Sequence, residues 1–380
     1  MWLVVFDDTD LTPNQIEMAR RAAAGHFIDL TSSNPTQQGL LFPPEVLEHA
    51  ASNYWRQRRY EPNPRGLEPA RQAIIEYYQQ RTPALVLTFD DIFITASTSE
   101  AYSLLFSLLT APGDNILGPN VTYPLFEYLA DLHHVELRTY ELDPANDWAL
   151  DQASLLAAAD ERTRAILLIS PHNPTGAIIS EPIAALQQLA IPLICDEVFA
   201  PFALAKPAVP PLGVLHPDVP VFHLNGISKL LALPDLKLGW IALNQAAQRY
   251  AERLELINDT FLSCSTLIQS MLPALLQAAP AFIAQMLERV RSNIDYARQH
   301  LAEHPRLIWS EPAGGYYLFL QVRDEYDDEA LVVRLIEQGV LVHPGFFFDW
   351  NDDCRIMLSA LTEPNQWRAG IQKLAQNLTI

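Results

Sequence analysis

The chain of 380 residues is short of positive charge. It carries 25 Lys and Arg against 45 Asp and Glu, which gives a formal net charge of −20 at pH 7. Phosphate groups repel a surface of this sign, so the composition argues against nucleic acids and anionic membranes as partners. We therefore expect no nucleic-acid partner and no membrane partner.

Cysteine is also scarce. The chain has three, Cys195, Cys264 and Cys354, and no two of them lie at a spacing typical of a paired site. A sparse, odd set of this kind does not make a disulfide framework or a zinc site. We expect reduced thiols and no metal site, as in a cytoplasmic protein.

Long apolar runs are missing as well. The run from Trp2 to Phe6 stops at Asp7 and is therefore too short for a signal peptide or a membrane span. It also lacks the basic residues that precede the apolar part of a signal peptide. No later stretch reaches about 18 uninterrupted apolar residues. Together with the unpaired cysteines, this pattern favours a cytoplasmic location.

Lysine is the scarcest charged residue, with four positions in the whole chain: Lys206, Lys229, Lys237 and Lys373. If a lysine amine carries out the chemistry, the candidates are therefore few. Lys206 lies in a proline-rich segment and Lys373 in the expected last helix, where a solvated side chain is the simpler interpretation.

The middle of the chain alternates short apolar runs with helical patterns. This alternation predicts an α/β fold with a mostly parallel sheet that helices cover on both faces. The pattern predicts a helix over 99–110. The expected strands are 92–95, 114–117, 135–139, 165–169, 192–195, 221–224 and 238–243.

The pattern changes after about residue 245 and predicts a smaller α+β lobe. Two long helices, roughly 246–278 and 280–303, are expected to be separated at Pro280. A strand near 316–320, a helix near 328–337, strands near 339–343 and 354–358, and a helix near 364–378 follow. We expect a large domain over 46–245, and a small domain made of 1–45 and 246–380.

Three polar residues follow expected buried strands. Asn173 comes after the run AILLIS, Asp196 after PLIC, and Lys229 after VFHLNGIS. Because the carboxyl ends of parallel strands meet at one edge of a sheet, these side chains are expected to share one cleft. A lysine that forms an imine, a carboxylate that pairs with a ring nitrogen, and an amide donor suit an aldehyde cofactor with a pyridine ring.

Eight short motifs together resemble the class I/II aminotransferases, which are pyridoxal-phosphate (PLP) enzymes of fold type I. The resemblance runs from about Asp29 to Ser359. In chain order the motifs are Tyr60–Gly66, Ser97–Ala101, Thr122–Pro124, His172–Gly176, Asp196–Phe199, Ser228–Lys229, Lys237–Trp240 and Arg355.

The resemblance implies a large domain with a seven-stranded-type sheet, PLP as cofactor, and a role for each matching residue. Lys229 would carry the imine and then move a proton between the substrate α-carbon and the cofactor. Asp196 would pair with the ring nitrogen, and Asn173 would hydrogen-bond the phenolic oxygen. Tyr123 would stack on the ring.

The resemblance also implies which residues bind the phosphate and the substrate. Residues Ser97, Thr98 and Ser99, at the start of a helix, would bind the phosphate with Lys237 and, from a neighbouring subunit, Tyr60. Ser228 would also contact the cofactor. Arg355 would bind the substrate α-carboxylate in a bidentate way. Ser33 and Asn173 would complete the substrate site.

Three positions depart from the family pattern. Phe199, also expected in the cofactor site, stands where many relatives have a tyrosine. Gly226 stands where a serine often contacts the phosphate, and Lys237 where an arginine is usual. The phosphate site is therefore expected to be atypical.

The resemblance implies transfer of the amino group of an α-amino acid to a 2-oxo acid, in a homodimer with shared active sites. Another PLP reaction, such as β-elimination or decarboxylation, is the nearest alternative. A non-catalytic PLP-binding protein is a more distant alternative. Such proteins usually carry a DNA-binding domain, whereas only about 28 residues precede Asp29 here and the net charge is −20.

Overall fold

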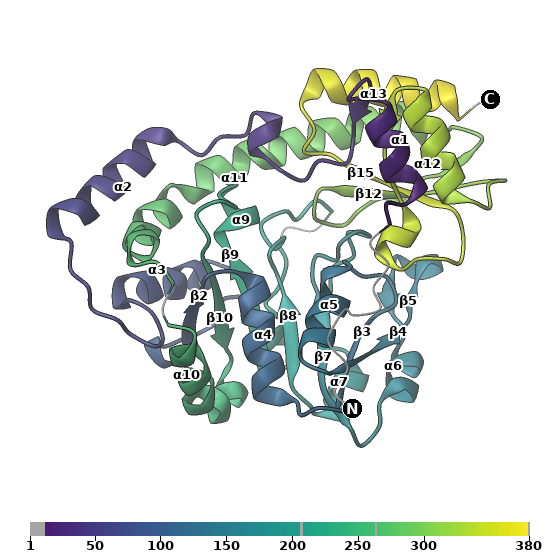
Figure 1. Ribbon diagram of the computed structural model, residues 1–380. Coiled ribbons are helices and arrows are strands. Elements are labelled where there is room, and N and C mark those ends of the chain that lie inside the picture. Colours follow the sequence, from purple (N-terminus) through teal and green to yellow (C-terminus); the bar gives the residue numbers. More distant parts are fainter. Residues whose placement is uncertain (1–11, 206–207, 263, 379–380) are drawn as a thin grey trace.

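The structure is a computed structural model that describes residues 12–205, 208–262 and 264–378. The apolar run Trp2–Phe6 and Lys206 lie outside the described residues. A large sheet with its covering helices forms one part of the molecule, and a smaller lobe sits above one end of it (Figure 1).

The large sheet has seven strands in the order β2-β10-β9-β8-β7-β3-β4. All neighbouring pairs are parallel except those of β10, which runs antiparallel to both β2 and β9. This confirms the expected α/β fold with a mostly parallel sheet. The strands are β2 (Ile92–Thr95), β3 (Asn115–Pro119), β4 (Glu136–Tyr140), β7 (Thr163–Ile169), β8 (Leu193–Asp196), β9 (Val221–Gly226) and β10 (Gly239–Leu243).

Alternate residues of these strands enter two different cores, as a sheet covered on both faces requires. Ile194 of β8 packs with α4, α5 and α10, whereas its neighbours Leu193 and Cys195 pack on the opposite face. The helices around this sheet are α3 (Glu68–Gln79), α4 (Thr98–Leu109), α5 (Leu125–Leu132), α6 (Gln152–Ala158), α7 (Ala184–Leu189), α8 (Leu212–Leu215), α9 (Ile227–Leu230) and α10 (Ala251–Thr260).

The smaller lobe is built on a four-stranded antiparallel sheet in the order β11-β12-β15-β14. The N-terminal segment contacts it, because β1 pairs with β13 and the Ser359 N–H donates to the Leu30 carbonyl. Its elements are α1 (Gln15–Ala22), β1 (Ile28–Asp29), β11 (Leu307–Ile308), β12 (Tyr317–Val322), α12 (Asp328–Glu337), β13 (Val340–Leu341), β14 (His343–Pro344), β15 (Arg355–Ser359) and α13 (Pro364–Asn377).

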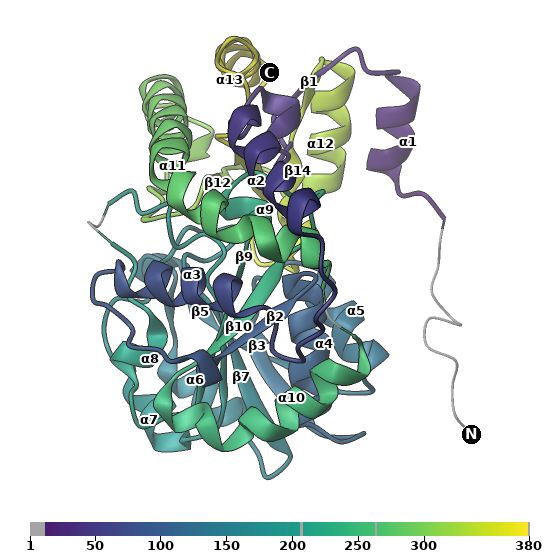
Figure 2. The same cartoon turned by 90° about the vertical axis from the view of Figure 1, so that its left-hand side faces the viewer.

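The expected helix break at Pro280 is wrong. Helix α11 runs unbroken over Thr266–Leu301 with Pro273 and Pro280 inside it, and the preceding helix, α10, ends at Thr260. An internal proline costs about 3 kcal/mol through its lost N–H bond and its ring clash. Packing along α11 against α2 (Pro44–Gln57), α3 and α13 offsets this cost (Figure 2).

Helix α11 is also long and apolar enough to cross a membrane by length and composition. The buried core helix of a soluble protein meets the same criterion, and α11 packs against three other helices. The remaining short elements are a hairpin of β5 (Leu142–Asp143) and β6 (Ala149–Leu150), and 3₁₀ turns at Thr36–Gln38, Phe89–Asp91, Pro144–Asn146, Gln245–Tyr250 and Gly345–Phe348.

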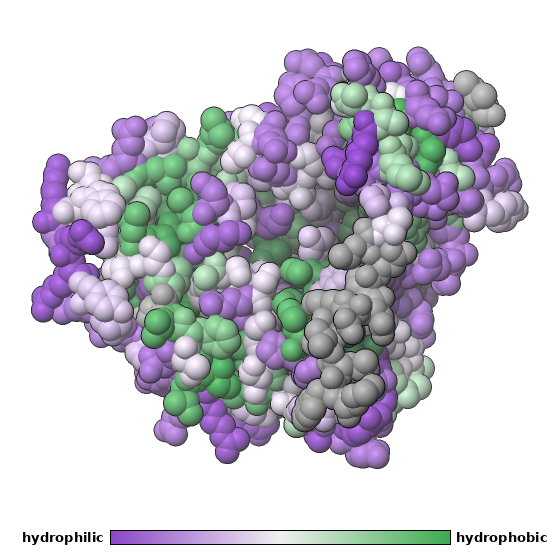
Figure 3. Space-filling model, in the orientation of Figure 1, coloured by the Kyte–Doolittle hydropathy of each residue, from purple (hydrophilic) through white to green (hydrophobic). Residues whose placement is uncertain are grey.

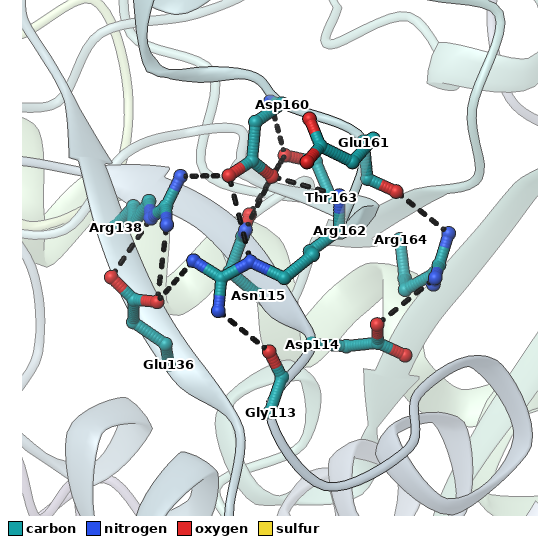
Figure 4. A network of polar contacts seen from close by, with 10 residues as sticks. All are labelled: Gly113, Asp114, Asn115, Glu136, Arg138, Asp160, Glu161, Arg162, Thr163 and Arg164. Atoms are coloured by element: carbon teal, nitrogen blue, oxygen red, sulfur yellow. Dashed lines mark hydrogen bonds and ion pairs between the residues drawn. The ribbon is translucent and has the colours of Figure 1, made fainter.

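A network of ion pairs lies where β3, β4 and β7 begin (Figure 4). Asp160 accepts hydrogen bonds from Asn115 Nδ2 at 2.8 Å and from Arg138 Nη1 at 2.7 Å. Arg138 also pairs with Glu136 at 2.8 Å, and Arg164 pairs with Asp114 at 3.0 Å. These charges lie at the amino ends of the strands, opposite to the edge described next.

Candidate active site

A cavity of about 150 Å³ opens at the carboxyl ends of the large sheet, with one side formed by the smaller lobe. It offers about ten times the space that one buried water needs. The sequence predicts eight of its lining residues: Ser33, Thr98, Ser99, Tyr123, Asn173, Asp196, Phe199 and Lys229. They follow the ends of β1, β2, β3, β7, β8 and β9, so the expected convergence of Asn173, Asp196 and Lys229 takes place.

Asp196 ends β8 and is 7% exposed. The Tyr102 hydroxyl donates to its Oδ2 at 2.9 Å, and the Val198 N–H donates to its Oδ1 at 3.1 Å. Burial raises the pKa of Asp196 to about 6, against the opposing effect of these donors and of the Lys229 charge. The carboxylate is therefore held in place by two donors, but its burial makes the charged form less favourable than in water.

Lys229 lies in the short helix α9, directly after β9. Burial lowers the pKa of its amine, and the charge of Asp196 opposes that shift. An amine with a lowered pKa is more often unprotonated near neutral pH, which makes it a better nucleophile and base.

Asn173 and Phe199 also face the cavity. The buried Oδ1 of Asn173 has no hydrogen-bond partner among the described residues, a state that costs free energy unless a ligand or water satisfies it. Phe199 packs edge-on against Tyr316, with ring centroids 5.0 Å apart. Tyr123 lies at the rim and is about half exposed.

The N-terminus of α4 approaches the cavity through Thr98 and Ser99. Ser97 caps this helix by accepting from the Glu100 N–H at 3.1 Å, and Glu100 in turn accepts from the Ala96 N–H. Free N–H groups at a helix N-terminus favour a phosphate. Glu100 occupies one of the donors next to them.

Two glycines bring three backbone segments together beside this helix end. A Cβ on Gly226 would lie 2.8 Å from the Leu238 carbonyl oxygen, and a Cβ on Gly239 would lie 2.8 Å from the Ser97 carbonyl carbon. Gly226 is thus explained by close packing: a serine there would displace β10.

The remaining predicted cofactor residues lie outside the cavity lining. Ser97 caps α4, Ser228 is half-buried beside Lys229, and Lys237 is exposed with a φ of 52°. Tyr60 is 77% exposed in the segment after α2.

Arg355 is 5% exposed and does not line the cavity. Its Nε pairs with Asp353 Oδ1 at 2.7 Å, and its Nη2 donates to Oδ2 at 2.9 Å. Its guanidinium lies 4.7 Å from the ring centroid of Trp148 and 5.3 Å from that of Trp350. The arginine is thus held by an aspartate and by aromatic faces.

Sequence reasoning did not find several lining residues: Tyr102, Leu125, Phe126, Ile169, Val198 and Tyr317. The place of Tyr102 on the cavity side of α4 could have been predicted, because it lies four residues after Thr98 and so on the same helix face; its hydroxyl contact with Asp196 could not. The place of Tyr317 could not have been predicted, since it depends on how the smaller lobe sits on the sheet. Burial raises its pKa to about 12, and Ser33 hydrogen-bonds it.

The family model described as aminotransferase class I and II matches residues 25–374. The chain therefore belongs to this family. The predictions of fold type I, PLP as cofactor and a PLP-dependent transaminase are confirmed.

Several relatives show how similar the chain is to named proteins. Tyrosine aminotransferase of Homo sapiens is 27% identical over 88% of this chain and 77% of its own length. Probable aminotransferase TAT2 of Arabidopsis thaliana is 30% identical over 78% of this chain and 75% of its own length. S-alkyl-thiohydroximate lyase SUR1 of the same plant is 31% identical over 74% of this chain and 64% of its own length.

Solved structures share the fold. An aminotransferase from Escherichia coli superposes with a TM-score of 0.87 at 23% identity, over 100% of this chain and 98% of its own. Alanine aminotransferase from Pyrococcus furiosus gives 0.86 at 24% identity, over 95% of both chains.

The residues in the cavity fit PLP. A half-buried lysine amine, a buried carboxylate and a helix N-terminus match the aldehyde, the ring nitrogen and the phosphate, and the unsatisfied Asn173 amide adds a polar contact. When bound, PLP supplies an aldehyde that condenses with amines and a protonated ring that withdraws electrons from the substrate α-carbon.

Proposed function

We propose that this transaminase works through the cavity residues predicted from the sequence, with Lys229 as the covalent anchor and proton carrier. The observation that carries the proposal is the placement of Lys229 and Asp196 in one buried cavity. Because burial lowers the pKa of the Lys229 amine, the amine is available to attack an aldehyde and to take up a proton.

Other residues of the chain orient and bind. Asp196 offers a fixed negative charge, Asn173 an amide, and Tyr123 an aromatic face at the rim. Thr98 and Ser99 offer hydroxyls and N–H groups at the α4 N-terminus. Ser97, Ser228 and Lys237 stay candidates for phosphate contacts from outside the described cavity.

We propose that the amino-acid substrate has an uncharged, preferably aromatic, side chain. Lys229 is the only basic residue among the described residues that line the cavity, so this chain offers no second cation there for a side-chain carboxylate. Phe126, Phe199 and Tyr317 give the lining an aromatic character instead. Relatives named tyrosine aminotransferase support this choice.

Elimination is the second candidate reaction, because one relative is named S-alkyl-thiohydroximate lyase. Both reactions begin with proton removal from the substrate, for which Lys229 is the base in either case. They differ in whether an oxo acid with an intact side chain is released.

Arg355 is proposed to bind the substrate α-carboxylate. Its guanidinium is planar and already held against aromatic rings, so little order is lost when it binds a carboxylate. Because Asp353 occupies its Nε and Nη2, a substrate carboxylate has to use the remaining N–H groups or displace Asp353.

A homodimer is proposed from exposed apolar side chains. Trp55, Tyr60, Leu256, Phe261 and Leu262 are all more than half exposed. Figure 3 shows apolar side chains gathered on the face that carries α10 and the adjoining part of α11. Such a patch is typical of an interface, and Tyr60 would reach the neighbouring cavity from there. A cytoplasmic location is proposed from the sequence reasons given above.

A spectral screen tests the reaction and the substrate class together. Purified, PLP-loaded protein is mixed with single amino acids, and loss of visible absorption and formation of pyridoxamine phosphate and oxo acid are measured. Tyrosine and phenylalanine are expected to give at least about ten-fold higher kcat/KM than aspartate, the effect of about 1.4 kcal/mol of differential binding. Faster turnover of aspartate would contradict the proposed substrate class, and ammonia release without pyridoxamine phosphate would favour elimination.

Sedimentation tests the dimer. The protein is expected to sediment as a dimer at assay concentrations, and Tyr60→Phe should weaken PLP retention without changing the mass. A fully active monomer would contradict the shared site.

A further inference from the structure

The Tyr102 hydroxyl and the Asp196 carboxylate form a buried contact that the sequence prediction did not include. The hydroxyl donates to Oδ2 at 2.9 Å, and both residues line the cavity. Tyr102 is 2% exposed and burial holds its pKa well above its usual range, so the hydroxyl keeps its proton and acts as a donor.

Aromatic packing fixes where this hydroxyl points. The Tyr102 ring meets Phe126 edge-on with centroids 4.8 Å apart and lies 6.1 Å from Phe106. A phenylalanine at 102 would keep both ring contacts. The hydroxyl group is therefore not needed to fill space, and its bond to Asp196 is what distinguishes tyrosine from phenylalanine here.

Two neighbouring charges act on the Asp196 carboxylate, with opposite signs. Lys229 on α9 favours the ionised carboxylate, while the neighbouring Glu197 disfavours it. Glu197 is itself neutralised by Arg81 at 2.6 Å and accepts from the Tyr78 hydroxyl at 2.6 Å. Within the described part of the chain, Tyr102 is the side chain that hydrogen-bonds the Asp196 carboxylate directly.

We propose that Tyr102 is a positioning residue for the cofactor site: its hydroxyl holds the Asp196 carboxylate ionised and fixed in orientation, so that Asp196 can keep a proton on the ring nitrogen of bound PLP. The proposal rests on the role of Asp196 in the proposed function. Without the hydroxyl, the carboxylate becomes a stronger proton acceptor, and the shared proton moves from the ring nitrogen toward Asp196.

The experiment compares Tyr102→Phe with Tyr140→Phe. Tyr140 is a matched control, because it is also 2% exposed and its hydroxyl also donates one buried bond at 2.9 Å, but to the Leu167 carbonyl and away from this cavity. Each variant is loaded with PLP that carries ¹⁵N in the ring. The ¹⁵N chemical shift, the pH dependence of the visible spectrum, kcat and KM are measured.

For Tyr102→Phe, the ¹⁵N shift is expected to move toward that of unprotonated pyridine, and kcat to fall about ten-fold with little change in KM. A ten-fold loss matches the lower end of the range for hydrogen bonds to charged groups, about 1.5 kcal/mol. The acid limb of the pH profile should move to higher pH, because Asp196 then takes up a proton more readily. Tyr140→Phe should leave the ¹⁵N shift, the acid limb and kcat unchanged.

An unchanged ¹⁵N shift and acid limb in Tyr102→Phe would overturn the proposal, even if both variants lose stability. The same loss in Tyr140→Phe would also overturn it, since any buried hydroxyl would then have the effect. Asp196→Asn separates this inference from the proposed function. If Asp196→Asn changes the ¹⁵N shift and Tyr102→Phe does not, Tyr102 alone is excluded; if neither does, the role of Asp196 fails. In the Asp196→Asn background, Tyr102→Phe should add no further change.

Discussion

The two edges of the large sheet treat charge in opposite ways. At the amino ends of β3, β4 and β7, Asp160 keeps contact with water and is surrounded by donors, chiefly Asn115 and Arg138, which lower its pKa. At the carboxyl ends, Asp196 is buried, and burial raises its pKa to about 6 although Tyr102 and Lys229 favour the charge.

The contrast separates an edge arranged for stability from an edge arranged for chemistry. Asp160 is a partly exposed ion-pair residue, and its partners favour its charged form. Asp196 is kept where its charge is costly, as perturbed carboxylates at functional sites often are. One strand, β7, connects the two, with Thr163 at the ion-pair edge and Ile169 in the cavity wall.

The largest effect is expected from removing the Lys229 amine, at the carboxyl ends of the strands. Lys229→Ala should abolish covalent attachment of PLP and lower transamination by at least about 10³-fold, within the range for lost acid–base catalysis. Borohydride reduction followed by peptide mapping should find the pyridoxyl group on Lys229 in the parent protein. Lys373→Ala is the control, since Lys373 is exposed on α13 and should leave the label in place; a label on Lys237 in the parent protein would contradict the assignment.

The next prediction concerns how the free energy of unfolding depends on pH through Asp196. Because the folded-state pKa of Asp196 is about 6, the folded cofactor-free protein holds a proton there, between about pH 4 and pH 6, that the unfolded chain has released. This group's contribution to the free energy of unfolding therefore falls as the pH rises through that window, by up to about 3 kcal/mol.

Denaturant unfolding of cofactor-free wild type and Asp196→Asn at pH 4 and pH 7 measures this contribution. Wild type should lose stability relative to the variant as the pH rises. A relative gain instead would show that the carboxylate is stabilised by its partners, as at the ion-pair edge.

Arg355→Ala should weaken binding of amino acids by about 1.5–3 kcal/mol, the scale of a charge-assisted bond. Simple amines, which have no carboxylate, should lose little. Asp353→Asn is the paired variant: it removes the charge that occupies the guanidinium and should not weaken amino-acid binding. Equal losses for amines and amino acids in Arg355→Ala would mean that the arginine acts on folding, through its contacts with Trp148 and Trp350.

Phe199→Tyr should lower the pKa of the visible chromophore by about one unit or less, since one neutral hydrogen bond contributes about 1 kcal/mol. The added hydroxyl would stabilise the phenolate and draw it away from the protonated nitrogen on Lys229. A pH titration of the absorption band of both proteins measures it, and the variant should lose its protonated band at lower pH. An unchanged or raised pKa would mean that position 199 does not face the phenolic oxygen.

The smallest effect is expected at the ion-pair edge. Asp160→Asn should slightly lower the thermal stability near neutral pH, and added salt should shrink the difference. Because partners depress its pKa, Asp160 stabilises the fold above the unfolded-state pKa, and this contribution is lost as the pH falls. The visible spectrum of the loaded protein should not change; a spectral change would mean that the two edges are coupled through β7.

The sequence predicts most of the fold because buried strands and their helices are local patterns. The runs before Asp196 and Lys229 predict β8 and β9 to within a few residues. Pro280 misleads for the opposite reason: its local effect is to break a helix, and distant contacts of α11 override it.

The same division holds for the site. Residues at or soon after the ends of strands, such as Asn173 and Asp196, were predicted to share the cleft and do so. Tyr102 was missed because only tertiary packing shows that its hydroxyl meets Asp196. The enclosure of Arg355 by Trp148 and Trp350 depends on the meeting of separate loops with β15, which no local pattern reveals.

The close packing at Gly226 and Gly239 restricts which residues these two positions can accept. At each glycine an added Cβ would lie too close to a neighbouring backbone, that of Leu238 at Gly226 and that of Ser97 at Gly239. A serine placed at 226 by itself would therefore push β10 outward and, through Gly239, shift the start of α4. A library that varies position 226 alone should recover glycine, and other residues should appear there only together with changes in the segment around Leu238.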